Sequence, residues 1–483
     1  MELKNNVVRG VAWNVAEKAG TMLFQFCVSV VLLNLLTPDD YGVIPLLGFF
    51  CAVASAIVEG GFSQALIRKR EPAQSDFSSV FYFNAGMSLV LYLLLVALSW
   101  PLSRYYGVPE LWEIAPVLFL IVPATALGII QVTMLARRFD FKRLSQITVL
   151  SSFLSGVTAV GVAWAGGGVW SLVAQRVSVV VFRSMLLWLN GTWRPGGGFS
   201  FGAIRSMSGY SSQLLFTDIM NTALLNVPQM FIGKIYTQAQ TGFFDQGQKL
   251  KELPTNSLMQ AVQSVTFPAL SELQNDPEKF TASVRKIVMV MTFIMFPVMA
   301  GMIGVAPDVF RALLKPQWAP TVPLFRVLCL AGFLTPVSLI CYNVLKARCQ
   351  GADIFRMELA KKTIAVSLLA LTIPVSVEAI AWGQVFIALS DFLFNTAFSA
   401  RYSRYGLGRM VRDTAPAALL TALMAAAVWG VGMLLSQAGV WWRLAAEIGV
   451  GVAVYLVPAR LLRLEAMEEV WQIVRGALPG GGK

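Results

Sequence analysis

Apolar stretches of about 20 residues recur along the whole of this chain, and they restrict its fold more than any other feature. A helix of that length crosses roughly 30 Å of hydrocarbon. Only 13% of the 483 residues are charged and the mean hydropathy is +0.66, which excludes a water-soluble domain. We therefore predict an all-α polytopic membrane protein with about 14 transmembrane helices. The predicted spans are 11–36, 41–66, 78–101, 112–136, 145–165, 169–189, 207–233, 241–269, 287–305, 319–345, 363–377, 379–400, 414–435 and 444–459.

Basic residues alternate in density along the chain. Of the 38 Lys and Arg residues, 27 lie in the two termini and in every second connection, five lie in the other connections, and six lie inside predicted spans. Short cytoplasmic loops of membrane proteins carry the excess of Lys and Arg. We therefore expect both termini to be cytoplasmic. The six cations inside spans are Lys18, Arg176, Arg183, Lys249, Lys251 and Arg326.

The predicted span 241–269 is too polar to be found by hydropathy, because it contains residues such as Asp245, Lys249 and Glu252. Without this span, all the basic connections that follow it would lie outside the cell and would break the charge bias. We therefore retain it as a span. We expect neighbouring helices to shield it from lipid, since a polar helix at membrane depth needs polar partners or water.

The composition excludes several kinds of site. Histidine is absent, which removes His-based acid–base catalysis and His metal ligands. The five cysteines are odd in number and lack ligand spacing, so we predict no disulfide framework, no metal and no other cofactor. The net charge of +12 arises from loops that flank the membrane, so it does not indicate nucleic-acid binding. Residues 1–10 lead directly into the first span, and we expect that helix to remain as an anchor.

The chain repeats itself at an offset of about 200 residues. Residues 37–42 (Thr-Pro-Asp-Asp-Tyr-Gly) match residues 237–242 (Thr-Gln-Ala-Gln-Thr-Gly), and two further pairs of segments match in the same order. Six spans separate each pair, so we predict two six-helix lobes related by a pseudo-twofold axis along the membrane normal. The predicted division is an N-terminal lobe at 1–190, a cytoplasmic linker at 191–206, a C-terminal lobe at 207–402, and two further helices with a cytoplasmic tail at 403–483.

Several short motifs are concentrated near the start of the chain. They include residues 10–13 (Gly-Val-Ala-Trp), 17–20 (Glu-Lys-Ala-Gly), 36–42 (Leu-Thr-Pro-Asp-Asp-Tyr-Gly) and 60–67 (Gly-Gly-Phe-Ser-Gln-Ala-Leu-Ile), followed by 168–173 (Gly-Val-Trp-Ser-Leu-Val) and 193–195 (Trp-Arg-Pro). These motifs resemble those of the polysaccharide flippases of the MOP (multidrug/oligosaccharidyl-lipid/polysaccharide) superfamily, and most of all its Wzx-type branch of colanic and teichuronic acid export.

The resemblance covers residues 1–410 approximately. It implies an alternating-access transporter of the bacterial inner membrane that moves an undecaprenyl-diphosphate-linked oligosaccharide from the cytoplasmic to the periplasmic leaflet. It also implies membrane lipids, a polysaccharide polymerase and glycosyltransferases of the same pathway as partners.

Polar side chains inside the spans share helix faces, because positions three, four, seven or eleven apart lie on one side of a helix. Equivalent spans of the two lobes carry such stripes, so we predict a polar cavity between the lobes. The stripes are Asn14, Lys18, Thr21 and Gln25; Arg176 and Arg183; Gln213, Thr217 and Asn221; Asp245, Lys249, Glu252, Asn256, Gln260 and Gln263; and Gln384, Asp391 and Asn395.

The cargo that the resemblance implies suits these residues. Lys or Arg offsets the desolvation of a diphosphate, and amides bind sugar hydroxyls. The predicted substrate-binding cations are Lys18, Arg176 and Lys249, followed by Arg183 and Lys251, and the predicted amides are Asn14, Gln25, Gln213, Asn221 and Asn256. The alternative is that the cations pair with acids for structure, as Lys18 with Glu17 or Glu59 and Lys249 with Asp245 or Glu252, or that they extend to an interface.

Carboxylates inside the spans are candidates for carrying a coupling ion, since burial can raise the pKa of an acid until it holds a proton. Ion pairing with the lysines is the alternative, and the sequence does not distinguish protons, sodium or membrane potential as the driving force. The candidates are Glu17, Glu59, Asp218, Asp245, Glu252 and Asp391.

Three other functions are considered. A cation-coupled small-molecule exporter of the same superfamily would share the two lobes, but its cavity should favour acids and aromatic residues. A membrane glycosyltransferase or polymerase would need a large outer loop, and the longest predicted outer connection is only about 306–318. A scaffold without transport activity would not need charged stripes inside its spans.

Overall fold

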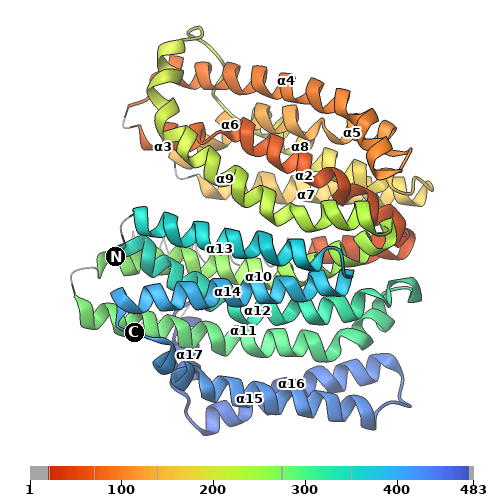
Figure 1. Ribbon diagram of the computed structural model, residues 1–483, viewed down its shortest axis with the longest axis vertical. Coiled ribbons are helices and arrows are strands. Elements are labelled where there is room, and N and C mark those ends of the chain that lie inside the picture. Colours follow the sequence, from red (N-terminus) through yellow and green to blue (C-terminus); the bar gives the residue numbers. More distant parts are fainter. Residues whose placement is uncertain are drawn as a thin grey trace. The chain divides into compact units, whose positions relative to one another are not determined.

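The computed structural model consists of helices and their connections in the residues it describes, which are 20, 22–69, 71–138, 140–273, 276–349 and 351–477. Within these ranges only the backbone is described at 68, 210–214, 216–218, 221, 224–225, 257–258, 260–272, 351–352 and 472–477. The helices shown in Figure 1 are α2 (Pro38–Glu59), α3 (Phe62–Arg68), α4 (Gln74–Tyr106), α5 (Leu111–Leu118), α6 (Ile121–Arg137), α7 (Phe141–Trp164), α8 (Trp170–Asn190), α9 (Phe201–Ile235), α10 (Gln238–Glu272), α11 (Pro277–Leu313), η1 (Pro316–Trp318), α12 (Thr321–Arg348), α13 (Gly351–Thr372), α14 (Val377–Ser403), α15 (Leu407–Leu434), α16 (Val440–Leu461) and α17 (Glu465–Ala477), preceded by the helix Met22–Leu35.

Ten helical segments of the described chain are long and apolar enough to cross a membrane. They match ten of the predicted spans, and the remaining four overlap the helix Met22–Leu35, α9, α10 and α13. The prediction of an all-α polytopic membrane protein is therefore confirmed. Two helices start well before their predicted spans, since α11 starts at Pro277 and not at 287, and α13 starts at Gly351 and not at 363.

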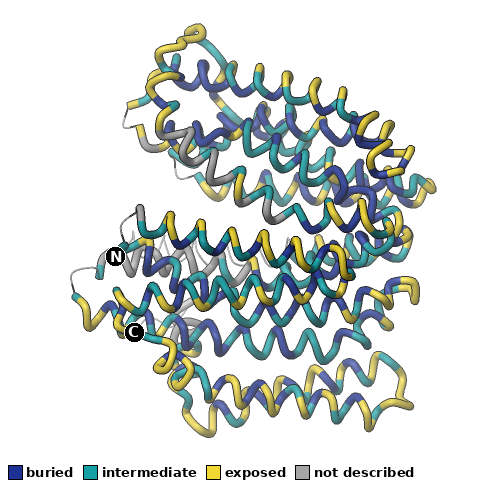
Figure 2. The backbone as a smooth tube through the Cα atoms, in the orientation of Figure 1, coloured by how far each residue is buried: buried dark blue, intermediate teal, exposed yellow. Residues whose placement is uncertain are grey.

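Large apolar side chains cover the outward faces of the helices, as lipid contact requires. Helix α4 exposes Leu89, Leu93 and Leu94 in this way. Trp441 and Trp442 are exposed at the end of α16 that the charge bias assigns to the outside, where aromatic residues favour the membrane interface. Figure 2 shows exposed and buried positions alternating along the same helices.

Two helix starts share one capping arrangement. Before α2, the Thr37 hydroxyl accepts from the Asp40 amide at 3.3 Å, and the Asp40 carboxylate accepts from the Thr37 amide at 2.8 Å. Before α10, Thr237 and Gln240 form the same two bonds at 3.2 and 3.3 Å. This reciprocal pair is a capping box, which satisfies backbone N–H groups that a helix start leaves without partners. The repeat seen in the sequence is thus a repeated helix start.

The same two helix starts approach each other through glycine. A Cβ atom at Gly42 would overlap the carbonyl group of Gln238, and one at Gly242 would overlap that of Pro38. Each glycine therefore lies against the first residue of the other helix, at a distance that no side chain allows. The contact is reciprocal, because each matched helix start meets the other through its own glycine.

The chain divides into two compact units, Met1–Gly242 and Phe243–Lys483. In the first unit, α2 packs along α9 and α6, and α8 packs against α6 and α7. The segment predicted as a linker at 191–206 is bound to α4 in its first half: Trp193 is buried against Phe81, and the Ser78 hydroxyl donates to the Gly196 carbonyl at 2.5 Å. The two units are defined by packing, whereas the predicted lobes are defined by the sequence repeat. The lobe boundaries therefore stay a prediction.

In the second unit, α12 packs along α14 and α11, and α15 packs against both α11 and α16. The Tyr455 hydroxyl of α16 donates to the Phe293 carbonyl of α11 at 2.7 Å. Helix α17 lies on α11, where Arg285 pairs with Glu465 at 2.9 Å. Between α14 and α15, burial raises the pKa of the Tyr405 phenol, so its hydroxyl stays protonated and donates to Asp413 at 2.9 Å.

Arg326, one of the six cations inside spans, has a structural explanation. Pro307 lies inside α11 and has no backbone N–H to donate to the carbonyl of Ile303, one turn earlier. The Arg326 side chain of α12 donates to that carbonyl at 2.9 Å. The cation therefore satisfies a backbone group that a proline leaves unpaired in a membrane helix.

Candidate functional site

The predicted site residues of the first span mostly lie outside the described residues. This holds for Asn14, Glu17 and Lys18. Gln25 is described and is exposed on the helix Met22–Leu35. Gln213, Asp218 and Asn221 belong to the part of α9 for which only the backbone is described. The other candidate residues with described side chains lie on α2 and α8 of the first unit and, separately, on α10, α13 and α14 of the second.

Helix α8 carries two arginines that face α2. Arg176 is exposed and acts electrostatically on the Cys51 thiol, whereas Arg183, seven residues later, is half-buried and acts on the Glu59 carboxylate. Cys51 and Glu59 are themselves about two turns apart on α2. The Arg183 Nε–H is buried and forms no hydrogen bond with any described group. A buried guanidinium N–H without an acceptor is costly, and it can bind an anionic oxygen strongly.

The predicted charged residues of α10 bind partners on the same helix. Lys249 forms an ion pair with Asp245, one turn earlier. Gln248 donates to the Glu252 carboxylate at 2.7 Å and accepts from Lys251 at 3.3 Å. Asn256, one turn after Glu252, is exposed. The structural pairing considered for Lys249 is therefore present. Lys251 and Glu252 also have hydrogen-bond partners on α10 itself.

A charged cluster in the second unit combines two predicted residues, Asp391 and Asn395, with a lysine that the sequence did not single out. Lys361 of α13 is 6% exposed, and its ammonium lies 2.6 Å from Glu358 and 3.6 Å from Asp391. It also donates to the Asn395 side chain at 3.2 Å, and Asn395 donates to Ser338 of α12 at 2.8 Å. We call Ser338, Glu358, Lys361, Asp391 and Asn395 the Lys361 cluster.

Lys361 was missed because its helix was predicted to start at residue 363, which placed the lysine in a cytoplasmic loop. In the structure it lies ten residues after the first residue of α13, about 15 Å along the helix axis. The Glu358–Lys361 spacing of three residues was the signal that could have found it. The cluster contains two carboxylates and one buried cation, so it can bind a further cation or proton.

A second buried network lies at the opposite end of the same unit. Arg443 of α16 lies 2.7 Å from Asp308 of α11 and 3.4 Å from Glu447, and both carboxylates are 2% exposed. A Cβ atom at Gly432 of α15 would meet Glu447 at 2.6 Å. The network joins α11, α15 and α16, so we assign it a structural role. Among the described residues, no group of three Cys, Asp or Glu residues has the arrangement of a metal site.

Comparison with known proteins places the chain in a family. Residues 31–323 match the family model described as "Polysaccharide biosynthesis protein". The chain belongs to this family. Its curated relatives include the succinoglycan biosynthesis transport protein ExoT of Rhizobium meliloti (strain 1021), which is 27% identical over 72% of this chain and 71% of the relative. The teichuronic acid biosynthesis protein TuaB of Bacillus subtilis (strain 168) is 21% identical over 94% of this chain and 95% of the relative.

A third relative is the lipopolysaccharide biosynthesis protein WzxC of Escherichia coli (strain K12), which is 20% identical over 75% of this chain and 74% of the relative. These relatives confirm the predicted resemblance to Wzx-type proteins.

Solved structures share the fold at low identity. The lipid II flippase MurJ in an inward closed conformation matches with a TM-score of 0.76 and 13% identity, over 93% of this chain and 99% of MurJ. An inward-facing MATE family multidrug transporter of the MOP superfamily matches with a TM-score of 0.62 and 15% identity, over 80% of this chain and 96% of that transporter. These likenesses confirm the predicted fold class.

Proposed function

We propose that this protein is a flippase, which moves an undecaprenyl-diphosphate-linked oligosaccharide from the cytoplasmic to the periplasmic leaflet of the bacterial inner membrane. Family membership and relatives named for succinoglycan, teichuronic acid and lipopolysaccharide support a saccharide cargo. The fold shared with the lipid II flippase MurJ suits a transporter. The protein is accordingly a membrane transporter and not an enzyme.

The observation that carries the proposal is the buried Nε–H of Arg183, which no described group accepts. A lipid diphosphate brings several anionic oxygens into surroundings of low dielectric constant, where a charge-assisted hydrogen bond is strong. Arg183 and Arg176 lie about two turns apart along α8. We propose that the diphosphate contacts Arg183 first and Arg176 second as it moves from the cytoplasmic end of α8 outward.

The remaining predicted residues take supporting roles. The exposed amides Gln25 and Asn256 can donate to and accept from sugar hydroxyls. Lys249 is engaged by Asp245, so the first-ranked cations that remain candidates for the diphosphate are Arg176 and Lys18. We further propose that both termini are cytoplasmic, and that a polysaccharide polymerase and glycosyltransferases of the same pathway act with this protein.

The test is deletion of the gene, followed by measurement of where the lipid-linked oligosaccharide accumulates. An impermeant lectin added to spheroplasts reports the outer-leaflet pool, and extraction reports the total pool. We expect the total pool to persist and the lectin-accessible fraction to fall, with recovery on complementation. A normal accessible fraction in a strain without a paralogue would overturn the proposal.

A cation-coupled small-molecule exporter is the second candidate, and the Lys361 cluster favours it, because two carboxylates beside one lysine can bind a coupling cation. The likeness to a MATE family transporter is consistent with it but shows the fold alone. Efflux of organic cations from cells that express the protein would support this candidate. Efflux without any change in the lectin-accessible oligosaccharide would favour it over the flippase.

A further inference from the structure

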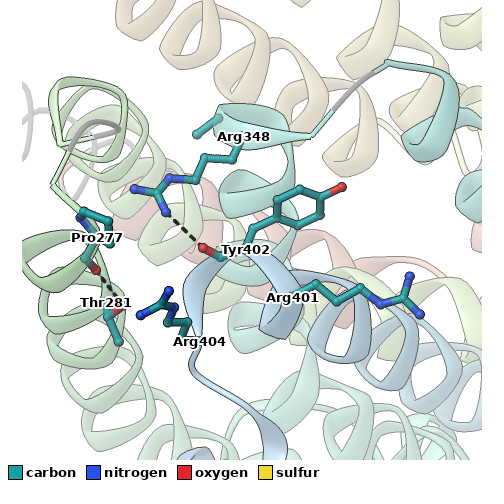
Figure 3. Close-up of a pocket in the computed structure, with 7 residues that line it drawn as sticks. Pro277, Thr281, Arg348, Arg401, Tyr402 and Arg404 are labelled. Atoms are coloured by element: carbon teal, nitrogen blue, oxygen red, sulfur yellow. Dashed lines mark hydrogen bonds between the residues drawn. The ribbon is translucent and has the colours of Figure 1, made fainter.

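A pocket of about 470 Å³ lies in the second unit, at the end of the helices that carries the basic connections. The start of α11 and the ends of α12 and α14 form it, and Figure 3 shows its lining. Three of the seven lining residues are arginines, and the seven contain no Asp or Glu. The lining consists of Pro277, Thr281, Ala347, Arg348, Arg401, Tyr402 and Arg404.

Arg348 is held in place before any ligand binds. Its guanidinium donates to the Tyr402 carbonyl at 3.0 Å and stacks 3.7 Å from the centre of the Phe280 ring. In Figure 3 the guanidinium groups of Arg348 and Arg404 lie on the same side as Thr281, whereas Arg401 points away from them. Arg401 lies instead over the Phe398 ring, at 5.1 Å. The pocket therefore presents two guanidinium groups on one side, and Arg348 loses little freedom on binding.

Arg404 occupies a backbone position that favours glycine. It ends α14 in the left-handed region, with φ of 53° and ψ of 16°, and its amide donates to the Ala400 carbonyl. Glycine adopts this conformation without the steric cost that a side chain adds. An arginine at this position is thus not explained by the backbone, and strained residues concentrate at functional sites.

The membrane topology alone does not explain these arginines either. Other cations at the same end of the unit are neutralised: Arg285 by Asp413 and Glu465, Lys286 by Glu469, and Lys279 by Asp276. Arg401 and Arg404 form no ion pair with the described residues. Asp353 acts electrostatically on the Tyr402 phenol, but it does not line the pocket. The lining therefore carries positive charge that an anion can neutralise.

We propose that this pocket binds a phosphate group. Two guanidinium groups that line a cavity without Asp or Glu match the charge and the fork geometry that phosphate oxygens accept. The group can belong to an anionic lipid headgroup or to free phosphate or diphosphate in solution. The end of the spans, where the pocket lies, is the level at which basic pockets between transmembrane helices contact headgroups. The proposal does not depend on the identity of the transported cargo.

The experiment uses the full chain in lipid nanodiscs and two probes. The lipid probe is phosphatidylglycerol titrated into phosphatidylcholine nanodiscs, with retained lipid counted by native mass spectrometry. The soluble probe is pyrophosphate, measured by calorimetry in phosphatidylcholine nanodiscs. Saturable binding of the lipid probe assigns a headgroup site, and saturable binding of pyrophosphate assigns a site for free phosphate groups. Binding of neither probe to the unmodified chain would overturn the proposal.

Arg404→Gly separates binding from folding, because glycine suits the left-handed backbone while the guanidinium is lost. We expect the probe that binds the unmodified chain to bind this variant about tenfold more weakly or worse, at an equal or higher melting temperature. Arg412→Gln is the matched control, since Arg412 is an exposed arginine of the same region outside the pocket. Equal affinity of Arg404→Gly and the unmodified chain, or equal loss in Arg412→Gln, would contradict a specific site.

Discussion

Individual basic residues of this protein satisfy backbone groups as well as setting the topology. Arg137 donates to the carbonyls of Leu66, Ile67 and Lys69 at 2.5, 3.1 and 2.8 Å, and so caps the end of α3. Carbonyls at a helix end lack intrahelical partners, and a cation nearby also suits the helix dipole. Arg183 differs from Arg137, because its buried Nε–H is not used within the described structure.

The first prediction concerns Arg183. Arg183→Gln removes the charge but keeps a hydrogen-bonding side chain, so we expect flipping to fall by about tenfold or more with normal protein levels. The lectin assay on spheroplasts measures the rate, and immunoblotting of membranes measures the protein. Arg104→Gln is the control, because Arg104 stacks over Trp100 at 4.1 Å near the end of α4. Flipping at the normal rate in Arg183→Gln would assign Arg183 to structural pairing with Glu59.

A second prediction concerns the Lys361 cluster. Lys361→Met removes the only cation within 4.0 Å of Glu358 and Asp391 among the described ion pairs. We expect a loss of about 2 kcal/mol in stability, below the full value for a buried pair because both carboxylates are partly exposed. Thermal unfolding in detergent measures the change. Adding Glu358→Gln to Lys361→Met should restore part of the lost stability. If Lys361→Met alone is as stable as the unmodified chain, the cluster tolerates net negative charge.

At the scale of whole helices, two segments matched by the sequence repeat prove to be in contact. The matched starts of α2 and α10 carry equivalent capping boxes and meet at Gly42 and Gly242. The sequence showed that these segments match, and the reason for their glycines appears only in the contact between them. For helix α13 the sequence was misleading. Its first half is polar, so the ten residues of helix before Lys361 were predicted as a loop.

The third prediction tests this contact. Gly242→Ala places a methyl group against the Pro38 carbonyl, so the helix starts must separate, and we expect a loss of about 2–3 kcal/mol. Gly86→Ala is the matched control, since a Cβ atom there meets no atom within 4 Å and alanine favours a helix. Thermal unfolding of both variants in the same detergent makes the comparison. If Gly242→Ala proves as stable as Gly86→Ala, the close approach is not needed for the fold.

At the scale of the molecule, alternating charge in the connections predicts the orientation. The fourth prediction uses single cysteines in a chain whose five native cysteines are replaced. An impermeant maleimide should label Gly166→Cys, between α7 and α8, in intact spheroplasts, and should label Ala73→Cys, before α4, only after the membrane is opened. Labelling of both positions in intact spheroplasts would contradict the proposed topology. Labelling of only Ala73→Cys would reverse it.

Contiguous stretches of sequence were enough to predict the class of the protein, the helices and the family resemblance. These follow from hydrophobic length, charge bias and local motifs, which are properties of contiguous residues. Even the polar helix α10 could be predicted, because the charge count of the following loops required it. The pairing of Lys249 with Asp245 was also among the sequence-based alternatives, since both lie on one helix face.

The packed fold sets how charges on different helices combine. It brought Lys361 of α13 to Asp391 and Asn395 of α14, left the Arg183 Nε–H without a described acceptor, and gathered Arg348 and Arg404 around one pocket. Side chains on separate helices meet according to the rotation and spacing of those helices, which packing fixes and periodicity within one helix does not. The candidate binding residues are therefore those whose surroundings are determined by helices other than their own.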